Sequence, residues 1–444
     1  MTADGEVRTE DEDRARFIGS LYEGPQPSPG AAAEPASESD NEILDGVERK
    51  MPRRGSAIWE KTPKGLARLI VYEREATASK EPQFGLKVGC FCTPLDDLGV
   101  TYGKPNLDLG ENLASGGPLP VEFLDRMDTW SYAKAELAQW LDRHRRMHQD
   151  QIQLVIKDDT RYRIPWELLW VPSLAESGLA DGYLGAVLTV TRWVRVKSFW
   201  PPFVKPVTGL YQAEGPVVAY VDPDMLHDRE LLRELHFDVD HAENMRELFH
   251  KLRDGSKDLA LVYVASHGEF DDDSGGCVLG GLSIGQAGKF NDDLPRLRNP
   301  ATLVFLNGCR TGSYGIDTRT YNDGALRGFA LVFLRAGAAG VLATTGAVGN
   351  KEAGELAEAL FRLISADRSV TVAEAVRRLR AVAAEKIARL LDAGNPQDAD
   401  NELILSLIYP FMYVYFGSPE LLVSVATRDD SGGQGEPGAG NGVT

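Results

Sequence analysis

From residue 216 onward the sequence alternates short, continuously apolar runs with longer amphipathic stretches, and this alternation constrains the fold more than any other feature. Continuous apolar runs predict buried strands, and the amphipathic stretches between them predict crossover helices. We therefore expect an α/β fold with a mainly parallel sheet covered by helices on both faces. The expected strands are residues 217–221, 259–265, 302–306 and 340–345, and the expected helices are 239–252, 325–335, 351–364 and 372–391.

The preceding residues predict a smaller α/β or α+β unit at 56–205, ahead of the main domain at 206–427. Its strand-like runs are residues 66–72, 152–156 and 187–196. A helical pattern between the first two runs puts these side chains on one face: Trp130, Ala133, Leu137, Trp140 and Leu141. The Pro-rich stretch at 201–206 continues neither a strand nor a helix, so it forms a natural joint between the two units.

Both ends of the chain have compositions that cannot bury a core. The first 50 residues hold thirteen Asp or Glu against five Lys or Arg, so we expect an acidic, disordered segment at 1–55. Residues 428–444 are rich in glycine and have no periodic apolar pattern, which predicts a flexible tail.

The overall charge and the cysteine count exclude several classes of protein. A net charge of −18 argues against direct nucleic-acid binding, which depends on basic side chains. Four cysteines in 444 residues cannot form a dense disulfide framework, so we expect a cytoplasmic protein with free thiols. The most apolar stretch, residues 324–348, contains Arg327 and Arg335, which predicts a buried helix and strand with no membrane association.

Two predicted strands each end in a reactive side chain. The run Leu261-Val262-Tyr263-Val264-Ala265-Ser266 leads into His267, and the run Thr302-Leu303-Val304-Phe305-Leu306-Asn307-Gly308 leads into Cys309. Carboxyl ends of adjacent parallel strands lie about 4.8 Å apart, so an imidazole can meet a thiol at this edge of the sheet. A histidine beside a cysteine can act as its base and then as the acid for a leaving amine. Gly268 and Gly308 next to them leave room for a substrate backbone and free amides for an oxyanion.

Three segments resemble the CHAT family of caspase-like cysteine peptidases, which are relatives of separase. They are Ala265-Ser266-His267-Gly268, Asn307-Gly308-Cys309-Arg310-Thr311-Gly312 and the predicted closing strand Pro410-Phe411-Met412-Tyr413-Val414-Tyr415-Phe416-Gly417. The segment Arg163-Ile164-Pro165-Trp166-Glu167-Leu168-Leu169 looks like one often found upstream of CHAT domains. The interval of 42 residues between His267 and Cys309 is also close to the roughly 50-residue interval of caspases.

This resemblance implies a role for each matching residue. His267 is expected to be the general base and acid, Cys309 the nucleophile, and the backbone amides of Gly268 and Cys309 the oxyanion hole. The chain also departs from the family pattern. Asn307-Gly308 replaces Ser-Ala, Arg310 replaces Glu, and Thr344-Thr345-Gly346 replaces a Leu-Trp that would form a substrate wall.

Acidic and amide side chains near the strand ends are candidates for substrate binding. They are Asp222, Asp224, Asn307 and Asp323. An acidic lining favours Arg or Lys before the scissile bond. The alternative for Asp222-Pro223-Asp224 is a turn with a helix-capping carboxylate.

Other polar motifs are assigned structural roles. Cys90 and Cys92 lack a second Cys or His pair nearby in the sequence, so we expect core packing. His144 and His148 flank Arg145 and Arg146, which predicts a solvated basic face. A solvated face is also expected for Arg377, Arg378 and Arg380. Residues 283–290 resemble a phosphate loop but lack its first glycine and its final hydroxyl.

These features together predict an intracellular cysteine endopeptidase that needs no metal or organic cofactor. The expected partners are a protein substrate and an activating protein that orders the loops after His267 and Cys309, at residues 271–276 and 313–322. By analogy with bacterial relatives, a defence or conflict system is the expected setting. The alternative is a catalytically silent caspase-like scaffold in which His267 and Cys309 serve packing.

Overall fold

The computed structural model describes residues 62–428, apart from short gaps within that span. The gaps are residues 75–81, 110–112, 114–118, 150, 159, 161, 174–177, 195–209, 255–257, 272–275, 289–293, 298–300, 317–325 and 394–400. The predicted acidic segment at 1–55, the joint at 201–206 and the tail after residue 428 therefore lie outside the described residues.

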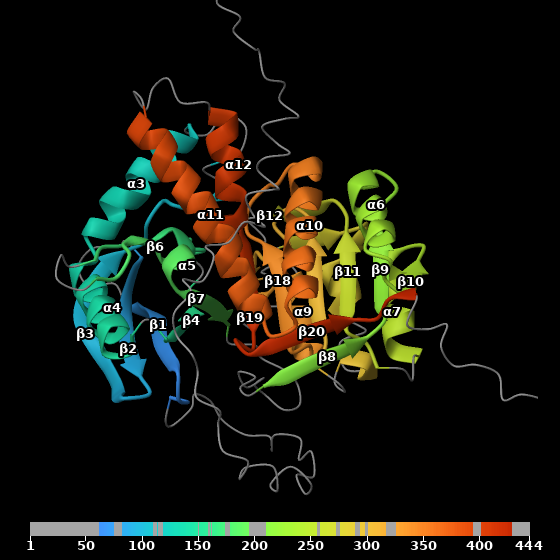
Figure 1. Cartoon of the computed structure of the whole chain (residues 1–444), viewed down its shortest axis with the longest axis horizontal. Coiled ribbons are helices and arrows are strands. Elements are labelled where there is room, and N and C mark those ends of the chain that lie inside the picture. The colour runs from blue at the N-terminus through green and yellow to red at the C-terminus, as the bar shows by residue number, and fades with distance from the viewer. Residues whose placement is uncertain are drawn as a thin grey trace, which may run out of the picture.

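Eleven strands form one large sheet, which extends across the molecule in Figure 1 from β3 on the left to β10 on the right. They are β1 Leu66–Arg74, β2 Gln83–Cys90, β3 Thr93–Gly103, β4 Gln153–Asp158, β7 Thr189–Trp193, β9 Val217–Val221, β10 Val239–Ala242, β11 Leu261–Ala265, β15 Leu303–Asn307, β18 Gly340–Thr344 and β19 Tyr413–Gly417. Their order in the sheet is β10-β9-β11-β15-β18-β19-β7-β4-β1-β2-β3. Only β18 with β19, β1 with β2 and β2 with β3 pair antiparallel. The prediction of a mainly parallel sheet is confirmed.

Helices and short strands connect and flank the large sheet. The helices are α3 Pro120–Tyr132, α4 Ala135–Met147, α5 Leu184–Val187, α6 Leu226–Glu234, α7 Met245–Asp254, α8 Ile284–Ala287, α9 Phe329–Ala336, α10 Asn350–Ala366, α11 Val372–Ala393 and α12 Asn401–Met412, with single 3-10 turns at Trp166–Leu168 and Pro295–Leu297. The short strands are β5 Trp170–Val171, β6 Gly182–Tyr183, β8 Tyr211–Gly215, β12 Gly268–Asp271, β13 Gly276–Leu279, β14 Leu282–Ser283, β16 Gly315–Ile316, β17 Leu326–Arg327 and β20 Leu421–Val425.

Side chains of the central strands alternate between two hydrophobic cores. Leu261 and Tyr263 of β11 belong to a core shared with α6, α10, α11 and α12. Val262 and Val264 of the same strand belong to a second core, shared with α7 and α9. Because successive side chains of a strand point to opposite faces, these two cores lie on the two faces of the sheet. The helices therefore cover both faces, as predicted.

The sheet continues without a break into the first part of the chain. Strand β19 pairs with β7 at Phe416 and Arg192, and β7 in turn pairs with β4. Strands β1, β2, β4 and β7 pack with α4 in a third hydrophobic core of their own. The other two cores cross the predicted boundary at residue 205, since Phe123 shares one with Ile408 and Trp193 shares the other with Phe416. The domain limits themselves remain a prediction.

Three predicted elements have different structures. The helical pattern expected to place Trp130, Ala133 and Leu137 on one face is divided between α3, which ends at Tyr132, and α4, which begins at Ala135, and Ala133 is exposed. Residues 239–252 were expected to be one helix, but Val239–Ala242 pairs with β9 as the edge strand β10, and α7 begins only at Met245. Pairing to an open sheet edge outweighs helix propensity over four residues. The expected closing strand at 410–417 starts at Tyr413, because α12 continues through Pro410 to Met412.

Helix α4 also differs from its predicted environment. His144 and Arg145 were expected on a solvated basic face, yet they are only 3% and 0% exposed. Both residues follow the buried Leu141 by three or four positions, so they share its face of the helix. Arg145 Nη2 donates a hydrogen bond to the Ala180 carbonyl at 3.0 Å. The basic side chains near the end of α4 are therefore partly structural.

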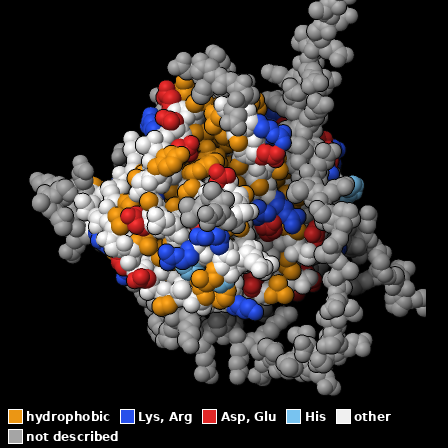
Figure 2. All heavy atoms as spheres, turned by 60° about the vertical axis from the view of Figure 1, so that its left-hand side comes forward, with side chains coloured by type: hydrophobic (Ala, Val, Ile, Leu, Met, Phe, Trp, Pro, Cys, Tyr) orange, Lys and Arg blue, Asp and Glu red, His pale blue; other side chains and the backbone are white. Residues whose placement is uncertain are grey.

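The outer surface of the first part of the chain is mixed in character. Figure 2 shows acidic and basic side chains interspersed on this face, with hydrophobic side chains gathered toward its top. Among the described residues, every helix is too short or too polar to cross a membrane.

Candidate active site

The two strands that precede the predicted dyad are direct neighbours. Strands β11 and β15 run parallel, and their register places Ala265 opposite Asn307. His267 follows Ala265 by two residues, and Cys309 follows Asn307 by two residues. His267 and Cys309 therefore lie at the carboxyl ends of two adjacent strands. Each of them follows the last paired residue of its strand by two positions.

The two strand-end loops lie in direct backbone contact. A Cβ atom added at Gly268 would lie 2.2 Å from the carbonyl oxygen of Cys309. A Cβ added at Gly308 would lie 2.2 Å from the carbonyl oxygen of Ser266. Real Cβ atoms essentially never come this close to another atom, so only glycine fits either position. The backbone around His267 is thereby held against the backbone around Cys309.

Both side chains of the predicted dyad are accessible. His267 is exposed, and Cys309 is half-buried. The Cys309 Sγ lies 3.6 Å from the carbonyl oxygen of Val348, which is a weak hydrogen bond for a thiol. Of the four cysteines, Cys90 and Cys277 are buried.

The loop that carries Cys309 is fixed by hydrogen bonds to the end of β18. Arg310 has a φ of 56°, in the left-handed region, and its amide donates to the Gly346 carbonyl at 3.0 Å. The hydroxyls of Thr311 and Thr344 both donate to the Gly308 carbonyl. Thr344 is thus a buried support for the loop that carries Cys309.

A buried polar cluster lies at the end of β15, directly before this loop. The Asn307 amide nitrogen donates to Asp228 Oδ1 at 2.6 Å, and its amide oxygen accepts from the Tyr413 hydroxyl. The Tyr263 hydroxyl also donates to Asp228. Burial raises the pKa of the Asp228 carboxyl, and burial also raises the pKa of Tyr263 and of Tyr413 well above the ordinary value. Asn307 thus holds the sheet end together, at a position where the sequence predicted contact with substrate.

Two other predicted binding residues, Asp222 and Asp224, follow β9, which pairs with the side of β11 opposite β15. The Asp222 amide donates to the Ala265 carbonyl at 2.8 Å, and its carboxylate accepts from the Ser266 hydroxyl at 3.3 Å. The Asp224 amide donates to the Asp222 carboxylate at 3.3 Å, which fits the turn of the alternative interpretation. The helix-capping part of that interpretation is wrong, because the N-cap of α6 is Met225 and no side chain caps the helix. Asp224 is exposed. Asp323 and most of the loop at 313–322 lie outside the described residues.

A short sheet of β12, β13 and β14 follows His267, and two arginines hold its first strand. The guanidinium of Arg163 lies 4.9 Å from the centre of the Phe270 ring, and that of Arg310 lies 5.2 Å from it. Arg310 Nη1 also donates to the Phe270 carbonyl at 3.3 Å. Arg310, in the loop that carries Cys309, therefore holds β12, the strand that follows His267. Arg163, from the first part of the chain, contacts the same Phe270 ring.

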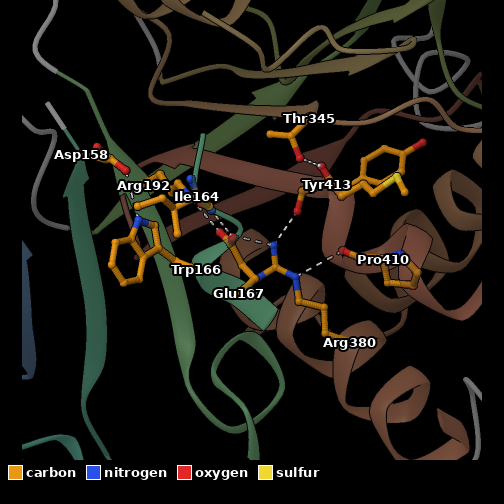
Figure 3. A network of polar contacts seen from close by, with 10 residues as sticks. Asp158, Ile164, Trp166, Glu167, Arg192, Thr345, Arg380, Pro410 and Tyr413 are labelled. Atoms are coloured by element: carbon orange, nitrogen blue, oxygen red, sulfur yellow. Dashed lines mark hydrogen bonds and ion pairs between the residues drawn. The ribbon is translucent and has the colours of Figure 1, made fainter. Parts of the chain in front are cut away.

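A buried ion-pair network, shown in Figure 3, joins the same segment to the core of the main domain. Glu167 forms an ion pair with Arg192, whose Nε lies 2.9 Å from Oε1, and Arg380 Nη2 lies 3.9 Å from Oε1. Arg380 donates to the carbonyls of Pro410 and Tyr413. Since the Tyr413 side chain reaches Asn307, polar contacts run from Glu167 to the end of β15.

The buried position of Arg380 was not predicted from the sequence. This residue was expected on a solvated face with Arg377 and Arg378, but its side chain is 1% exposed. The available signal was its spacing, because Arg380 lies four residues after Val376 and three before Ala383 on the apolar face of α11.

Comparisons with known proteins give one match to a family model over part of the chain. The family model described as "CHAT domain" matches residues 219–398, a span that contains both His267 and Cys309. Two crystal structures of the Saccharomyces cerevisiae separase–securin complex align with the chain at 15% and 13% identity, with TM-scores of 0.37 and 0.36. Each alignment covers 60% of this chain but only 16% and 15% of the other chain. No curated protein matches the sequence.

Proposed function

Because residues 219–398 form a CHAT domain, we propose that this chain is a cysteine endopeptidase in which Cys309 is the nucleophile and His267 the general base and acid. The observation that carries the proposal is the mutual contact of the two loops at Gly268 and Gly308. It keeps an exposed imidazole and a half-buried thiol at one edge of the sheet, where parallel α/β folds bind their ligands.

The proposed reaction has two stages. The Cys309 thiol gives its proton to His267, and its sulfur attacks the carbonyl carbon of a substrate peptide bond. His267 then donates that proton to the leaving amine, and the acyl part remains on Cys309 as a thioester. Water attacks the thioester after losing a proton to His267. The departing sulfur takes that proton back, which regenerates the thiol and releases a carboxylic acid.

The developing negative charge needs donors that are already in place. The backbone amides of Gly268 and Cys309 are the proposed oxyanion hole. The close contact between these two residues supports this assignment, because it holds both amides in one fixed region of the site. Such an arrangement needs no reorganisation when the tetrahedral intermediate forms.

The substrate preference follows from the carboxylates near His267. The Asp222 carboxylate accepts a hydrogen bond from Ser266, the residue directly before His267, and Asp224 is exposed. We propose that these two carboxylates, together with Asp323, favour Arg or Lys before the scissile bond.

Regulation by a partner is supported by the contacts of Phe270. This ring on the histidine strand lies between Arg310 of the cysteine loop and Arg163 of the upstream segment. A protein that binds the first part of the chain can therefore act on the histidine strand through Arg163. We propose such an activator, a cytoplasmic setting supported by the free thiols, and, by family analogy only, a defence or conflict system.

The proposal is tested by looking for new protein termini. Wild-type protein and three variants, Cys309→Ala, His267→Ala and His250→Ala, are each co-expressed with the products of neighbouring genes, and new termini are identified by mass spectrometry. His250 is exposed on α7, outside the site, and serves as the matched control. We expect new termini with wild type and His250→Ala and none with the other two variants. Identical termini in all four, or stable partner binding without any cleavage, would favour the silent scaffold.

A further inference from the structure

Two sulfur atoms meet an imidazole nitrogen that lies 56 and 58 residues further along the sequence, at the outer end of the first part of the chain. Cys90 ends β2, Cys92 lies in the tight turn before β3, and His148 directly follows α4. Their ligand atoms all lie within 4.8 Å of one another. Sequence reasoning assigned the two cysteines to core packing and His148 to a solvated face, because nothing local connects them. The fold connects them because α4 packs against the β2 and β3 side of the sheet, as Figure 1 shows.

We propose that Cys90, Cys92 and His148 bind one Zn²⁺ ion, with a solvent molecule as the fourth ligand. This goes beyond the proposed peptidase activity, and it differs from the sequence-based expectation that the chain needs no metal. Two thiolates and an imidazole are ligands that zinc prefers.

The observed distances match a tetrahedral zinc site. With Zn–S bonds of about 2.3 Å and Zn–N bonds of about 2.0–2.1 Å, sulfur and nitrogen ligands of one ion lie about 3.5 Å apart. The His148 Nε2 lies 3.5 Å from the Cys90 Sγ and 3.1 Å from the Cys92 Sγ. These two nitrogen–sulfur distances therefore lie within a few tenths of an ångström of the value expected for a bound ion, and the two sulfur atoms lie within 4.8 Å of each other.

A single hydrogen bond does not account for all three ligand atoms. The Nε2 atom of a neutral imidazole has either one lone pair or one hydrogen, so it forms one good hydrogen bond. Here two sulfur atoms lie within bonding distance of that single nitrogen. One cation at the centre of the three atoms satisfies all of them at once.

The surrounding residues hold the ligands in place. The Phe91 ring between the two cysteines packs on the His148 ring with centroids 4.5 Å apart, and the Phe91 amide donates to the Leu66 carbonyl at 3.0 Å. The His148 amide donates to the His144 carbonyl at 3.1 Å. Buried His144 is itself fixed at both ring nitrogens, by the Trp140 carbonyl at 2.9 Å and the Thr93 hydroxyl at 3.3 Å. A bound ion would thus fasten the β2–β3 turn to the end of α4.

The access to the site is also consistent with metal binding. Cys90 is buried, His148 is half-buried and Cys92 is exposed, so the cluster is open to solvent on the side of Cys92. An ion can enter from that side, and a water molecule can occupy the fourth position there. Because both thiols must be deprotonated to bind, loading the site releases protons.

The test measures metal content and affinity in the full chain, independently of peptidase activity. Protein purified under reducing conditions without chelator is analysed for zinc, then stripped and titrated with Zn²⁺ and with Co²⁺ as a spectroscopic probe. We expect one ion per chain and a thiolate-to-cobalt charge-transfer band. Cys92→Ser and His148→Gln should each weaken Zn²⁺ binding more than about 100-fold. This exceeds the loss of affinity that is usual when a residue that only hydrogen-bonds to a ligand is replaced.

Matched controls separate this proposal from the proposed function. Cys309→Ala removes a thiol and His250→Ala removes an imidazole elsewhere, and both should bind zinc as wild type does. Cys92 is exposed, so its serine variant is expected to fold, which circular dichroism checks. Absence of zinc binding by the reduced wild type, a Cys90–Cys92 disulfide that persists under reduction, or unchanged binding by both ligand variants would each overturn the proposal. None of these results bears on cleavage by Cys309.

Discussion

The contact between the two loops predicts that Gly308→Ala strongly lowers activity. Its new Cβ would lie 2.2 Å from the Ser266 carbonyl oxygen, and a tolerable contact needs at least 3.0 Å. The loops must therefore separate by at least 3.0 − 2.2 = 0.8 Å. A displacement of about 1 Å between catalytic groups can lower the rate about 100-fold, and overpacking of this kind typically destabilises a fold by about 1–3 kcal/mol.

The assay for this variant is kcat/KM on a peptide substrate, with chemical denaturation measured in parallel. Gly285→Ala is the matched control, because a Cβ at Gly285 in α8 meets no atom within 4 Å. We expect about a 100-fold loss of kcat/KM for Gly308→Ala and unchanged kcat/KM for Gly285→Ala. A folded Gly308→Ala protein that keeps kcat/KM within about twofold of wild type would refute the reasoning that these glycines hold the dyad in position.

Two further variants test the contacts around the site. Glu167→Gln removes the carboxylate that forms an ion pair with buried Arg192, so we expect a loss of about 3–5 kcal/mol in the free energy of unfolding at pH 7. The exposed control Glu385→Gln should cost less than about 1 kcal/mol. Burial alone would raise the pKa of Glu167, but the neighbouring guanidinium groups outweigh it and hold that pKa below its ordinary value. The ion pair therefore stabilises the fold above about pH 4.3, and this stabilisation is lost as the pH falls further. The difference in free energy of unfolding between wild type and Glu167→Gln should accordingly shrink in acid. A difference that does not depend on pH would contradict this assignment. Arg310→Ala removes the clamp on Phe270 and should lower kcat more than stability, which steady-state kinetics and thermal unfolding measure together; equal kcat in both proteins would show that the clamp is irrelevant.

The central strands of the sheet could be predicted from the sequence, because a continuous apolar run indicates a buried strand even when the neighbouring strands are unknown. The apolar runs at β9, β11, β15 and β18 all form strands, and they bring His267 and Cys309 to one edge. Edge strand β10 was missed, because four residues with mixed polarity become a strand only through pairing with β9.

Contacts between distant segments could not be predicted in the same way. Glu167 and Arg380 are more than 200 residues apart, and neither carries a local signal of the other. The same holds for Cys92 and His148, which meet only because α4 packs beside the β2–β3 turn. Periodicity predicts which face of an element is buried, but it does not identify the partner on that face.

The most direct test of the central claim is whether His267 activates Cys309. The rate of iodoacetamide alkylation is measured for each cysteine by mass spectrometry, in wild type, in His267→Ala and in the control His250→Ala. Buried Cys277 supplies the internal reference. The account predicts that Cys309 reacts faster than Cys277 and slows at least about tenfold in His267→Ala alone, since a general base commonly contributes about 100-fold or more. Equal, slow alkylation of both cysteines, or a Cys309 rate that is the same in all three proteins, would contradict it.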